Sequence, residues 1–363
     1  MDKELLNHFY FHDLLHDYLS CLTNEELYDN ELLSNLASSH AIPLLASKKG
    51  TLVFCKVCFY GNSKDRKSLV KELSALKEGI KEYALHKNSF LALLTLFQVM
   101  DDTKASGKIL KNLFVGDASA PTRKEEDEKD SPLLEIALHD IGSKLFFLLL
   151  PDDYASSPST SSPKKYFEAN EQEYLFHSSN NSKKDAEIRR QELCAYVQED
   201  ITNMCMQHTY ELITSKIGSL VLREVYNSFP SAELMDAIIN AYKIQDEENK
   251  YYLFEDPKSH LFIKNIFLSE CTNKKDTRAY YKSKAVNSLN IYFAKKFYDA
   301  FKGELSSIVG TNRGAFVISA LCDVEVVKDD VKKELDGCKE VIRGLVGEKE
   351  NGGHACLLRC LDG

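Results

Sequence analysis

Apolar residues recur at helical spacing along most of this chain. Positions three and four apart are apolar in almost every long stretch, whereas the strict alternation of a half-buried strand is scarce. Only 8 prolines and 16 glycines interrupt the 363 residues. The pattern therefore predicts an all-α protein.

A short phrase repeats within this helical pattern. It begins with a small residue, which we call the anchor, and continues through two variable positions into a Leu-rich turn. The anchors are Gly50, Ser89, Gly142, Gly218, Ser259, Gly314 and Gly353, with a weaker first copy at Phe11. We expect the small anchor side chain to let two neighbouring helices approach closely.

The spacing of the anchors indicates a repeat architecture. Anchors 11, 50 and 89 are 39 residues apart, as are 314 and 353, and anchors 218 and 259 are 41 apart. A period near 40 with two helices per unit is typical of an α-solenoid. Chance recurrence of helical phrases in a Leu-rich chain would explain such equal spacings less well.

Two wider gaps between anchors contain polar segments. Residues 122–131 are almost all charged or polar, and residues 156–163 are Ser- and Pro-rich, followed by a polar stretch to about 181. We predict N-terminal helical repeats over 1–150, a disordered loop over 151–182 and a C-terminal helical-repeat region over 183–363.

Composition narrows the class of protein. Hydrophobic residues at 44% and charged residues at 28% are typical of a folded, water-soluble chain. The longest apolar run, 145–150, is too short to cross a bilayer, so we predict no membrane partner. The ten cysteines lack disulfide-like spacing, which favours reduced thiols in an intracellular compartment.

Charge is distributed unevenly. The net charge of −9 argues against indiscriminate binding to phosphate backbones. Residues 41–115, however, carry 13 Lys and Arg against 6 Asp and Glu, a local charge of +7. If the chain holds RNA, this segment is the best candidate.

Several phrases resemble one known family. They are residues 61–67 (GNSKDRK), 100–104 (MDDTK), 181–193 (NSKKDAEIRRQEL), 256–261 (DPKSHL) and 312–315 (NRGA). Taken in this order, they are similar to the C-terminal part of the Puf-A/Penguin family of pumilio-like proteins, which includes a region called the CPL domain. The resemblance covers residues 45–361.

The resemblance implies a fold, a cellular compartment and a role. It implies pumilio-type, armadillo-like helical repeats curved into an arc or an L shape, with RNA on a basic concave face. It also implies the nucleus and nucleolus, processing of large-subunit ribosomal RNA and, in some members, translational regulation. Family members begin with a basic tail and further repeats, so we expect this chain to be a fragment, an incomplete gene model or a reduced protein.

Base-by-base recognition is not expected. In pumilio repeats three side chains of one helix contact one base. Here those positions are the first, second and fifth after each anchor, and most of them hold Leu, Phe, Ala or Cys. Such side chains cannot form the bidentate hydrogen bonds that distinguish base edges.

Phosphate contacts require only Lys, Arg and small polar donors. Candidates are Lys48, Lys49, Lys56, Lys64, Arg66, Lys67, Lys144, Arg223, Lys258, His260, Lys264, Asn312 and Arg313, and also Lys183, Lys184, Arg189 and Arg190. Any of them could instead be an ordinary solvated side chain, and Asn312 could equally cap a helix. We expect Arg223, Lys264 and Arg313 to lie on or near one face.

No motif indicates catalysis or a metal. His8, His12 and His16 would share a helical face, but surface histidines near the terminus are the better interpretation. Cys55 and Cys58 form a lone CxxC, more consistent with buried thiols than with zinc. We find no phosphate-binding loop, nucleophile elbow or kinase motif, and predict no enzyme activity and no cofactor.

Two functions follow. The first is a monomeric, sequence-tolerant binder of ribosomal or messenger RNA, acting with pre-ribosomal proteins in nucleolar ribosome assembly, with translational regulation as a further role. The alternative is a helical-repeat scaffold for protein partners that does not bind RNA. The net charge and the apolar base-reading positions favour the alternative.

Overall fold

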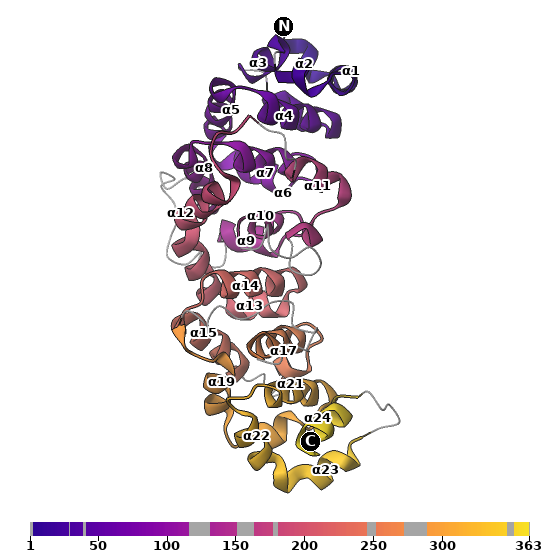
Figure 1. Ribbon diagram of the computed structural model, residues 1–363, viewed down its shortest axis with the longest axis vertical. Coiled ribbons are helices and arrows are strands. Elements are labelled where there is room, and N and C mark those ends of the chain that lie inside the picture. Colours follow the sequence, from indigo (N-terminus) through magenta and orange to yellow (C-terminus); the bar gives the residue numbers. More distant parts are fainter. Residues whose placement is uncertain are drawn as a thin grey trace. The chain divides into compact units, whose positions relative to one another are not determined.

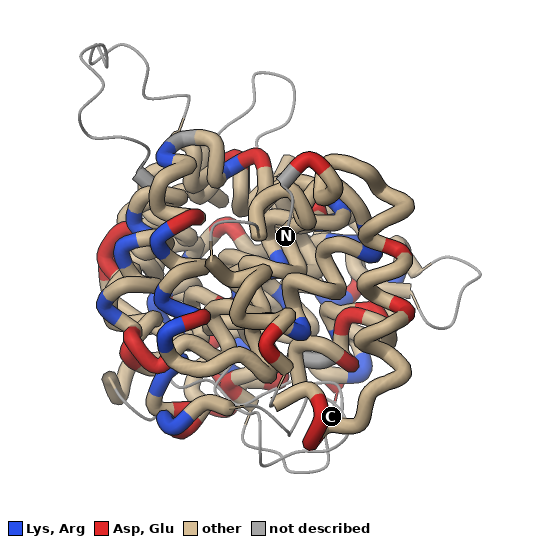
Figure 2. Tube along the Cα trace, turned by 90° about the horizontal axis from the view of Figure 1, so that it is seen from above, with Lys and Arg blue, Asp and Glu red and all other residues tan. Residues whose placement is uncertain are grey.

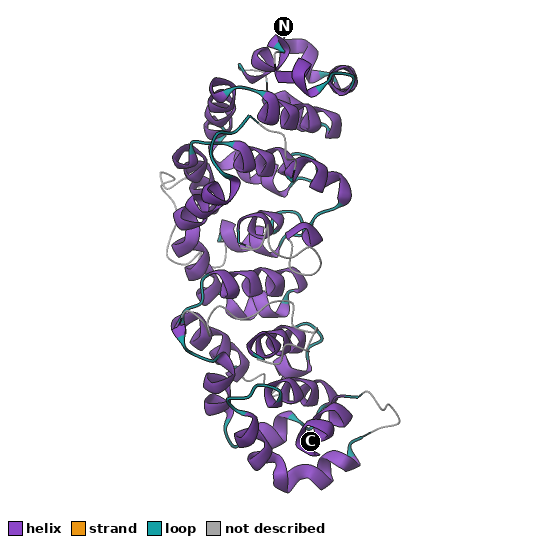
Figure 3. Ribbon diagram, in the orientation of Figure 1, coloured by secondary structure: helices purple, strands orange, loops and turns teal. Residues whose placement is uncertain are grey.

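The computed structural model describes residues 3–28, 30–38, 41–115, 131–150, 163–176, 181–244, 252–271, 289–346 and 352–362. These residues form helices and connecting turns, with no strand among them (Figure 3). The all-α helical-repeat prediction is thus confirmed. The predicted loop at 122–131 lies outside the described residues except for Ser131.

The chain divides into two compact units at residue 201, inside one long helix. Unit 1 contains η1 (Lys3–Asn7), α1 (Phe9–Ser20), α2 (Asn24–Tyr28), α3 (Glu31–Ala37), η2 (Ile42–Ala46), α4 (Lys48–Tyr60), α5 (Ser63–Ala75), η3 (Lys77–Gly79), α6 (Ile80–Leu85), α7 (Phe90–Val99), α8 (Thr103–Val115), α9 (Pro132–Leu138), α10 (Lys144–Leu149), η4 (Pro163–Tyr166), α11 (Ala169–Leu175) and most of α12 (Ala186–Gln207) (Figure 1).

Unit 2 begins at the end of α12. Its further elements are α13 (Thr209–Thr214), α14 (Lys216–Ser228), α15 (Ala232–Lys243), α16 (Tyr252–Glu255), α17 (Ser259–Glu270), α19 (Phe293–Phe301), α20 (Leu305–Ile308), α21 (Asn312–Cys322), α22 (Lys328–Leu335), η5 (Asp336–Cys338), α23 (Lys339–Gly344) and α24 (Gly353–Asp362).

A typical repeat contains three helices rather than the predicted two. A short helix precedes the helix that carries the anchor phrase, and a longer helix follows, as in α6–α7–α8 and α13–α14–α15. The short helix was missed because only a capped turn separates it from the next one. Ser215, for example, ends α13 and accepts a hydrogen bond at the start of α14.

We call the helices with the anchor phrase anchor helices. In unit 1 these are α1, α4, α7 and α10, and α4 packs between α1 and α7. In unit 2 they are α14, α17, α21 and α24, each packed against the next. Side chains at one register of the phrase therefore recur at one register of each stack.

The anchor glycines occupy space that no side chain could share. A Cβ on Gly50 would lie 2.2 Å from the carbonyl oxygen of Leu44, and one on Gly314 would lie 1.9 Å from that of Ile308. The same close approach occurs at Gly353. The prediction that small anchors allow close approach is confirmed at these positions.

A hydrogen-bonded chain completes the first anchor. Gly50 N donates to Ser47 Oγ at 3.0 Å, and Ser47 Oγ lies 2.7 Å from His12 Nδ1. His12 Nε2 in turn lies 2.7 Å from the carbonyl oxygen of Leu6. His12 is therefore buried and fully bonded, so its assignment as a surface histidine was wrong. His260 and His354, each directly after an anchor, are buried in the same way.

Part of the predicted disordered loop is ordered. Residues 163–176 form η4 and α11, while 151–162 and 177–180 lie outside the described residues. Phe167 and Leu175 are buried, and the ring of Tyr166 stacks on that of Phe147 with centroids 4.0 Å apart. These apolar side chains hold the segment on unit 1, although polar neighbours hide them in the sequence.

The cysteines and possible metal ligands form no disulfide or metal site among the described residues. All ten cysteines are free thiols, and Cys55 and Cys58 are both buried. Among the described residues, no His, Cys, Asp and Glu side chains gather into a metal-binding group. Within those same ranges, no helix has the length and apolar character needed to span a bilayer.

Candidate nucleic-acid interface

A groove of about 710 Å³ opens on unit 1 along its anchor helices. We call it the lysine groove, because Lys48, Lys49, Lys87 and Lys144 line it. Glu168, Glu171 and Glu173, from α11 and the residue before it, line it as well. Basic and acidic positions are interspersed along the traced helices (Figure 2).

The repeat phrase itself brings these lysines together. Lys48 and Lys49 directly precede the anchor Gly50, Lys87 precedes the anchor Ser89 by two residues, and Lys144 follows the anchor Gly142 by two. Lys48 and Lys49 begin α4, Lys144 begins α10, and Lys87 lies in the turn before α7. Stacking α4 on α7 then places the equivalent ends of these two helices side by side.

Lys144 is already paired in this groove. Its Nζ lies 2.5 Å from Oε1 of Glu171 and 4.9 Å from the centre of the Phe90 ring. The two charged side chains are only 16% and 9% exposed. This ion pair is therefore shielded from water more than an ordinary surface pair is.

The remaining groove lysines are more accessible. Lys48 and Lys87 are exposed. Lys49 lies 3.0 Å from Nδ1 of His16 and 3.9 Å from Asp17.

Lys56, about two turns further along α4, donates to the carbonyl oxygen of Leu19 at 3.0 Å. Partial burial lowers the pKa of Lys56, and the negative charge of Glu173 opposes that shift. The charge of Glu173 thus acts on Lys56 of α4.

A second hollow of about 410 Å³ lies at the start of α5 and brings Lys64, Arg66 and Lys183 together. Lys64, Lys183 and the nearby Lys67 are exposed. Arg66 is only 1% exposed and donates to the carbonyl oxygens of Gly61 at 2.8 Å and of Asn181 at 3.0 Å. Arg66 therefore holds the backbone, which corrects its assignment as a phosphate contact.

Three of the phrases that resemble the family, 61–67, 100–104 and 181–193, meet at Asp101 beside this hollow. Its carboxylate accepts from Ser182 Oγ at 2.5 Å and from Lys184 N at 3.0 Å, with Arg66 and Arg189 at 3.5 and 3.6 Å. Burial raises the pKa of Asp101, but these hydrogen bonds, a further one from Lys183 N and the charge of Arg66 outweigh burial and lower it to about 2. The cluster fastens residues 181–185 to unit 1.

Two other arginines of this region are structural as well. Arg189 donates to the carbonyl oxygen of Gln98, and Arg190 donates to that of Leu149 at 2.7 Å. Both guanidinium groups are buried, so neither is placed to meet a phosphate. Lys184, beside them, pairs with Glu192 at 2.7 Å.

Unit 2 brings three of the predicted residues together on α17 and α21. Lys264 lies over the ring of Phe316 at 5.0 Å, and Arg313 donates to the carbonyl oxygen of Glu255 at 2.7 Å. Burial lowers the pKa of His260, and the charges of Arg313 and Lys264 lower it further. Those positive charges are thus close enough to act on one imidazole.

The other unit 2 candidates differ in their surroundings. Lys258 is exposed and donates to the carbonyl oxygen of Thr214 at 3.2 Å. Arg223 is buried beside Glu224, 3.4 Å away, so it is not exposed for a phosphate contact as Lys258 is. A buried cation needs such a partner.

Asn312 has the capping role that the sequence left open. Its side-chain oxygen accepts from Gly353 N at 2.7 Å, at the first residue of α24. It caps the helix of the next repeat, whereas Thr311 caps its own helix α21.

The first of the three base-reading positions is largely inaccessible. The first residue after the anchor is buried in seven of the eight copies, Ser219 being the exception. A buried side chain cannot reach a base edge.

Sequence reasoning missed Lys87 and the three glutamates. Lys87 holds the place relative to Ser89 that Lys48 holds relative to Gly50, so aligning the anchor phrases would have found it. No sequence pattern relates Glu171 to Lys144, because their pairing is a tertiary contact.

The comparison with protein families finds a CPL (NUC119) domain at residues 160–279. Pumilio homolog 24 of Arabidopsis thaliana is 28% identical over 258 residues, covering 62% of this chain and 38% of that protein. Pumilio homolog 3 of mouse is 26% identical over 315 residues, covering 83% and 42%. The chain thus spans about two fifths of the length of these curated relatives.

Solved structures show the same fold. Human Puf-A has a TM-score of 0.77 at 21% identity, covering 99% of this chain and 63% of that one. Human Puf-A in complex with DNA gives 0.74 at the same identity and covers 62% of that chain. The RNA-binding domain of yeast Puf5p bound to SMX2 RNA gives 0.59 at 12% identity, covering 99% and 83%.

Proposed function

We propose that this chain, which belongs to the Puf-A/Penguin family of pumilio-like proteins, is a non-catalytic RNA-binding protein. The observation that carries the proposal is the lysine groove, which Lys48, Lys49, Lys87 and Lys144 line and in which Lys48 and Lys87 are exposed. Solved relatives of this fold have been captured with DNA and with RNA, which supports nucleic acid as the occupant.

Binding is proposed to be tolerant of base sequence. Ammonium groups attract phosphates regardless of the base, and the first of the three base-reading side chains is buried in seven of the eight copies. Leu52 and Leu91 also line the groove and offer apolar contact beside the lysines. Each neutralised phosphate releases counterions, so affinity should fall steeply as salt rises.

We extend the proposal to the setting that the family resemblance implies. The chain would act in the nucleolus, in the processing of large-subunit ribosomal RNA and together with pre-ribosomal proteins. A role in translational regulation of messenger RNA is the secondary possibility within the same RNA-binding activity. The CPL (NUC119) match supports this assignment to the Puf-A/Penguin branch of pumilio-like proteins.

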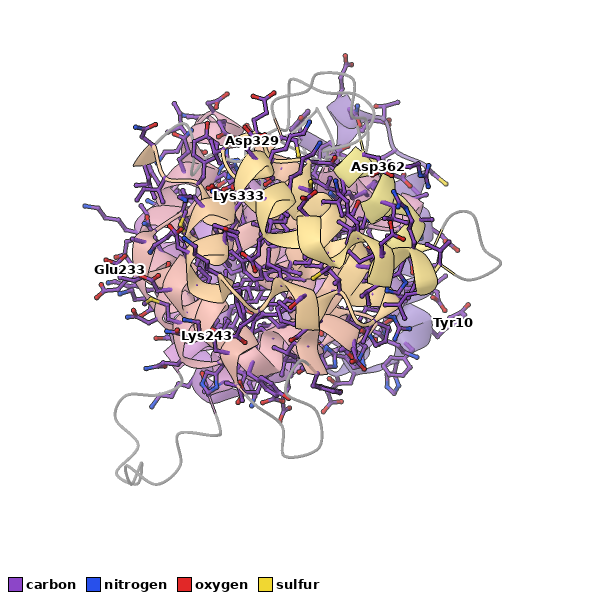
Figure 4. All side chains as sticks on the ribbon, turned by 90° about the horizontal axis from the view of Figure 1, so that it is seen from below. Tyr10, Glu233, Lys243, Asp329, Lys333 and Asp362 are labelled. Atoms are coloured by element: carbon purple, nitrogen blue, oxygen red, sulfur yellow. The ribbon has the colours of Figure 1, made fainter. Side chains whose placement is uncertain are left out.

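The test is fluorescence anisotropy with unrelated single-stranded RNAs across a salt series, using the purified chain and K48E/K49E. Two lost phosphate contacts should reduce the slope of log affinity against log salt by about 1.4 for single strands. The matched control is K243E/K333E, which makes the same charge change at two exposed lysines of α15 and α22 that lie at the surface of unit 2 (Figure 4).

Weaker binding by K48E/K49E than by K243E/K333E supports the lysine groove as the RNA site. Equal losses in both variants would mean that only total charge matters and would refute the groove. No binding by the parent chain at low salt would refute RNA binding and favour the protein scaffold.

A further inference from the structure

The segment 163–176 is an insertion into the repeat pattern. The two preceding repeats of unit 1 pass directly from the anchor helix to the following long helix, as α4 leads to α5 and α7 leads to α8. Between α10 and α12 the chain instead forms η4 and α11, and α11 packs back against α7 of the preceding repeat. Its position is therefore not needed to continue the helical stack.

The inserted helix carries concentrated negative charge into the lysine groove. Residues 168–175 contain three glutamates and no lysine or arginine. All three glutamates line the groove, together with its four lysines. Glu171 lies 2.5 Å from Lys144, and the charge of Glu173 acts on Lys56.

Carboxylates in this position occupy the place of an anionic ligand. Lys144 is mostly buried by Glu171 and Phe90, so a phosphate can pair with its ammonium group only after the Glu171 carboxylate has left. A phosphate beside these lysines would be repelled at short range by the carboxylates of Glu171 and Glu173. Occupation of the groove by α11 and by RNA are thus competing states.

We propose that α11 is an autoinhibitory element that occupies the lysine groove and must be displaced before RNA binds there. The inference rests on the proposed RNA-binding function and adds a regulatory step to it. The apparent affinity for RNA is then the intrinsic affinity reduced by the fraction of molecules in which α11 has left the groove.

The attachment of the segment is suited to such a switch. Tyr166 stacks on Phe147, and Phe167 and Leu175 are buried, so the segment is held at its apolar residues. On its C-terminal side, the Asp101 cluster fastens residues 181–185 independently of α11. Displacement of α11 would therefore leave α12 and the repeat stack in place.

The test compares RNA binding by the full chain with that of E168Q/E171Q/E173Q. Glutamine keeps the shape of glutamate, and at position 171 it can still complete the capping box at the start of α11. The matched control, E233Q/D329N/D362N, removes three exposed charges from unit 2 at surface positions (Figure 4). We expect the α11 variant to bind RNA about fivefold more tightly than the control, a typical coupling between two competing ligands.

Hydrogen exchange gives the second measurement on the parent chain. Saturating single-stranded RNA should slow amide exchange in α4 and α7 and accelerate it in α11. Equal affinities of the two triple variants, or slower exchange in α11 on RNA binding, would overturn autoinhibition while leaving RNA binding intact. If no variant binds RNA at low salt, the proposed function itself fails.

Discussion

Replacing one anchor glycine tests the packing rule on which the repeats depend. A Cβ on Gly314 would lie 1.9 Å from the carbonyl oxygen of Ile308 and 3.0 Å from Oγ1 of Thr311. An ordinary contact needs at least 3.4 Å. Alanine therefore forces α21 away from α20, or breaks the cap that Thr311 provides to Gly314 N at 3.1 Å.

The magnitude follows from two opposing effects. Overpacking of this kind costs about 1–3 kcal/mol of unfolding free energy, while alanine gains at most about 1 kcal/mol in helix propensity. We expect Gly314→Ala to destabilise unit 2 by about 1–2 kcal/mol. Gly344→Ala is the control, because a Cβ at the last residue of α23 meets no atom within 4 Å. It should be neutral or stabilising by up to about 1 kcal/mol.

Thermal unfolding followed by circular dichroism measures the difference. For a unit of this size the two variants should differ in Tm by about 4–8 °C, with Gly314→Ala the lower. If Gly314→Ala unfolds at or above the temperature of Gly344→Ala, the close approach of α21 to the Ile308 carbonyl is not a constraint. The explanation of the anchor residues would then be wrong.

Two further predictions concern buried charge. Asp101→Asn should destabilise unit 1 by about 2–3 kcal/mol in urea unfolding at pH 7, because Arg66 and Arg189 lose their shared carboxylate. Since hydrogen bonds hold the pKa of Asp101 at about 2, this stabilisation is present above pH 4 and is lost as the pH falls through 2. Asp101→Asn should lack this loss of stability between pH 4 and pH 2. The same loss in the variant would contradict its assignment to Asp101. In unit 2, burial raises the pKa of Glu270 from 4.5 to about 7, although the N–H groups of Ala294 and Phe293 oppose the shift. The folded state therefore binds this proton more tightly than the unfolded state, and stability should fall as the pH rises from about 4.5 through 7. Urea midpoints at pH 5 and pH 8 should converge in Glu270→Gln, and an unchanged difference between them would show that another group titrates.

The sequence predicted those features of the repeat that depend on residues close together in the chain. The glycine anchors at 50, 142, 314 and 353 were predictable because each packs against a backbone carbonyl of its own or a neighbouring repeat, so the same small residue is needed at the same step. The lysines of the groove at 48, 49 and 144 were nominated for a related reason, since they lie beside the anchors.

Whether an individual Lys or Arg side chain is buried or exposed was not predictable from the repeat phrase. Arg66 and Lys64 are two residues apart, yet Arg66 is buried against Asn181 while Lys64 is exposed. Burial here depends on a segment more than a hundred residues away. Likewise, the apolar residues that hold α11, Phe167 and Leu175, stand among polar neighbours that predict a loop.

By itself, the sequence determined the helical class, the repeat phrase and the family resemblance, because helical periodicity and anchor size are properties of residues close in the chain. Only the tertiary structure decided which cations remain accessible, that Asp101 unites three distant phrases, and that Glu171 occupies the groove beside Lys144. The physical reason is that desolvation and ion pairing depend on distances in space, which here are set by the packing of α11 on α7 and of residues 181–185 on Asp101.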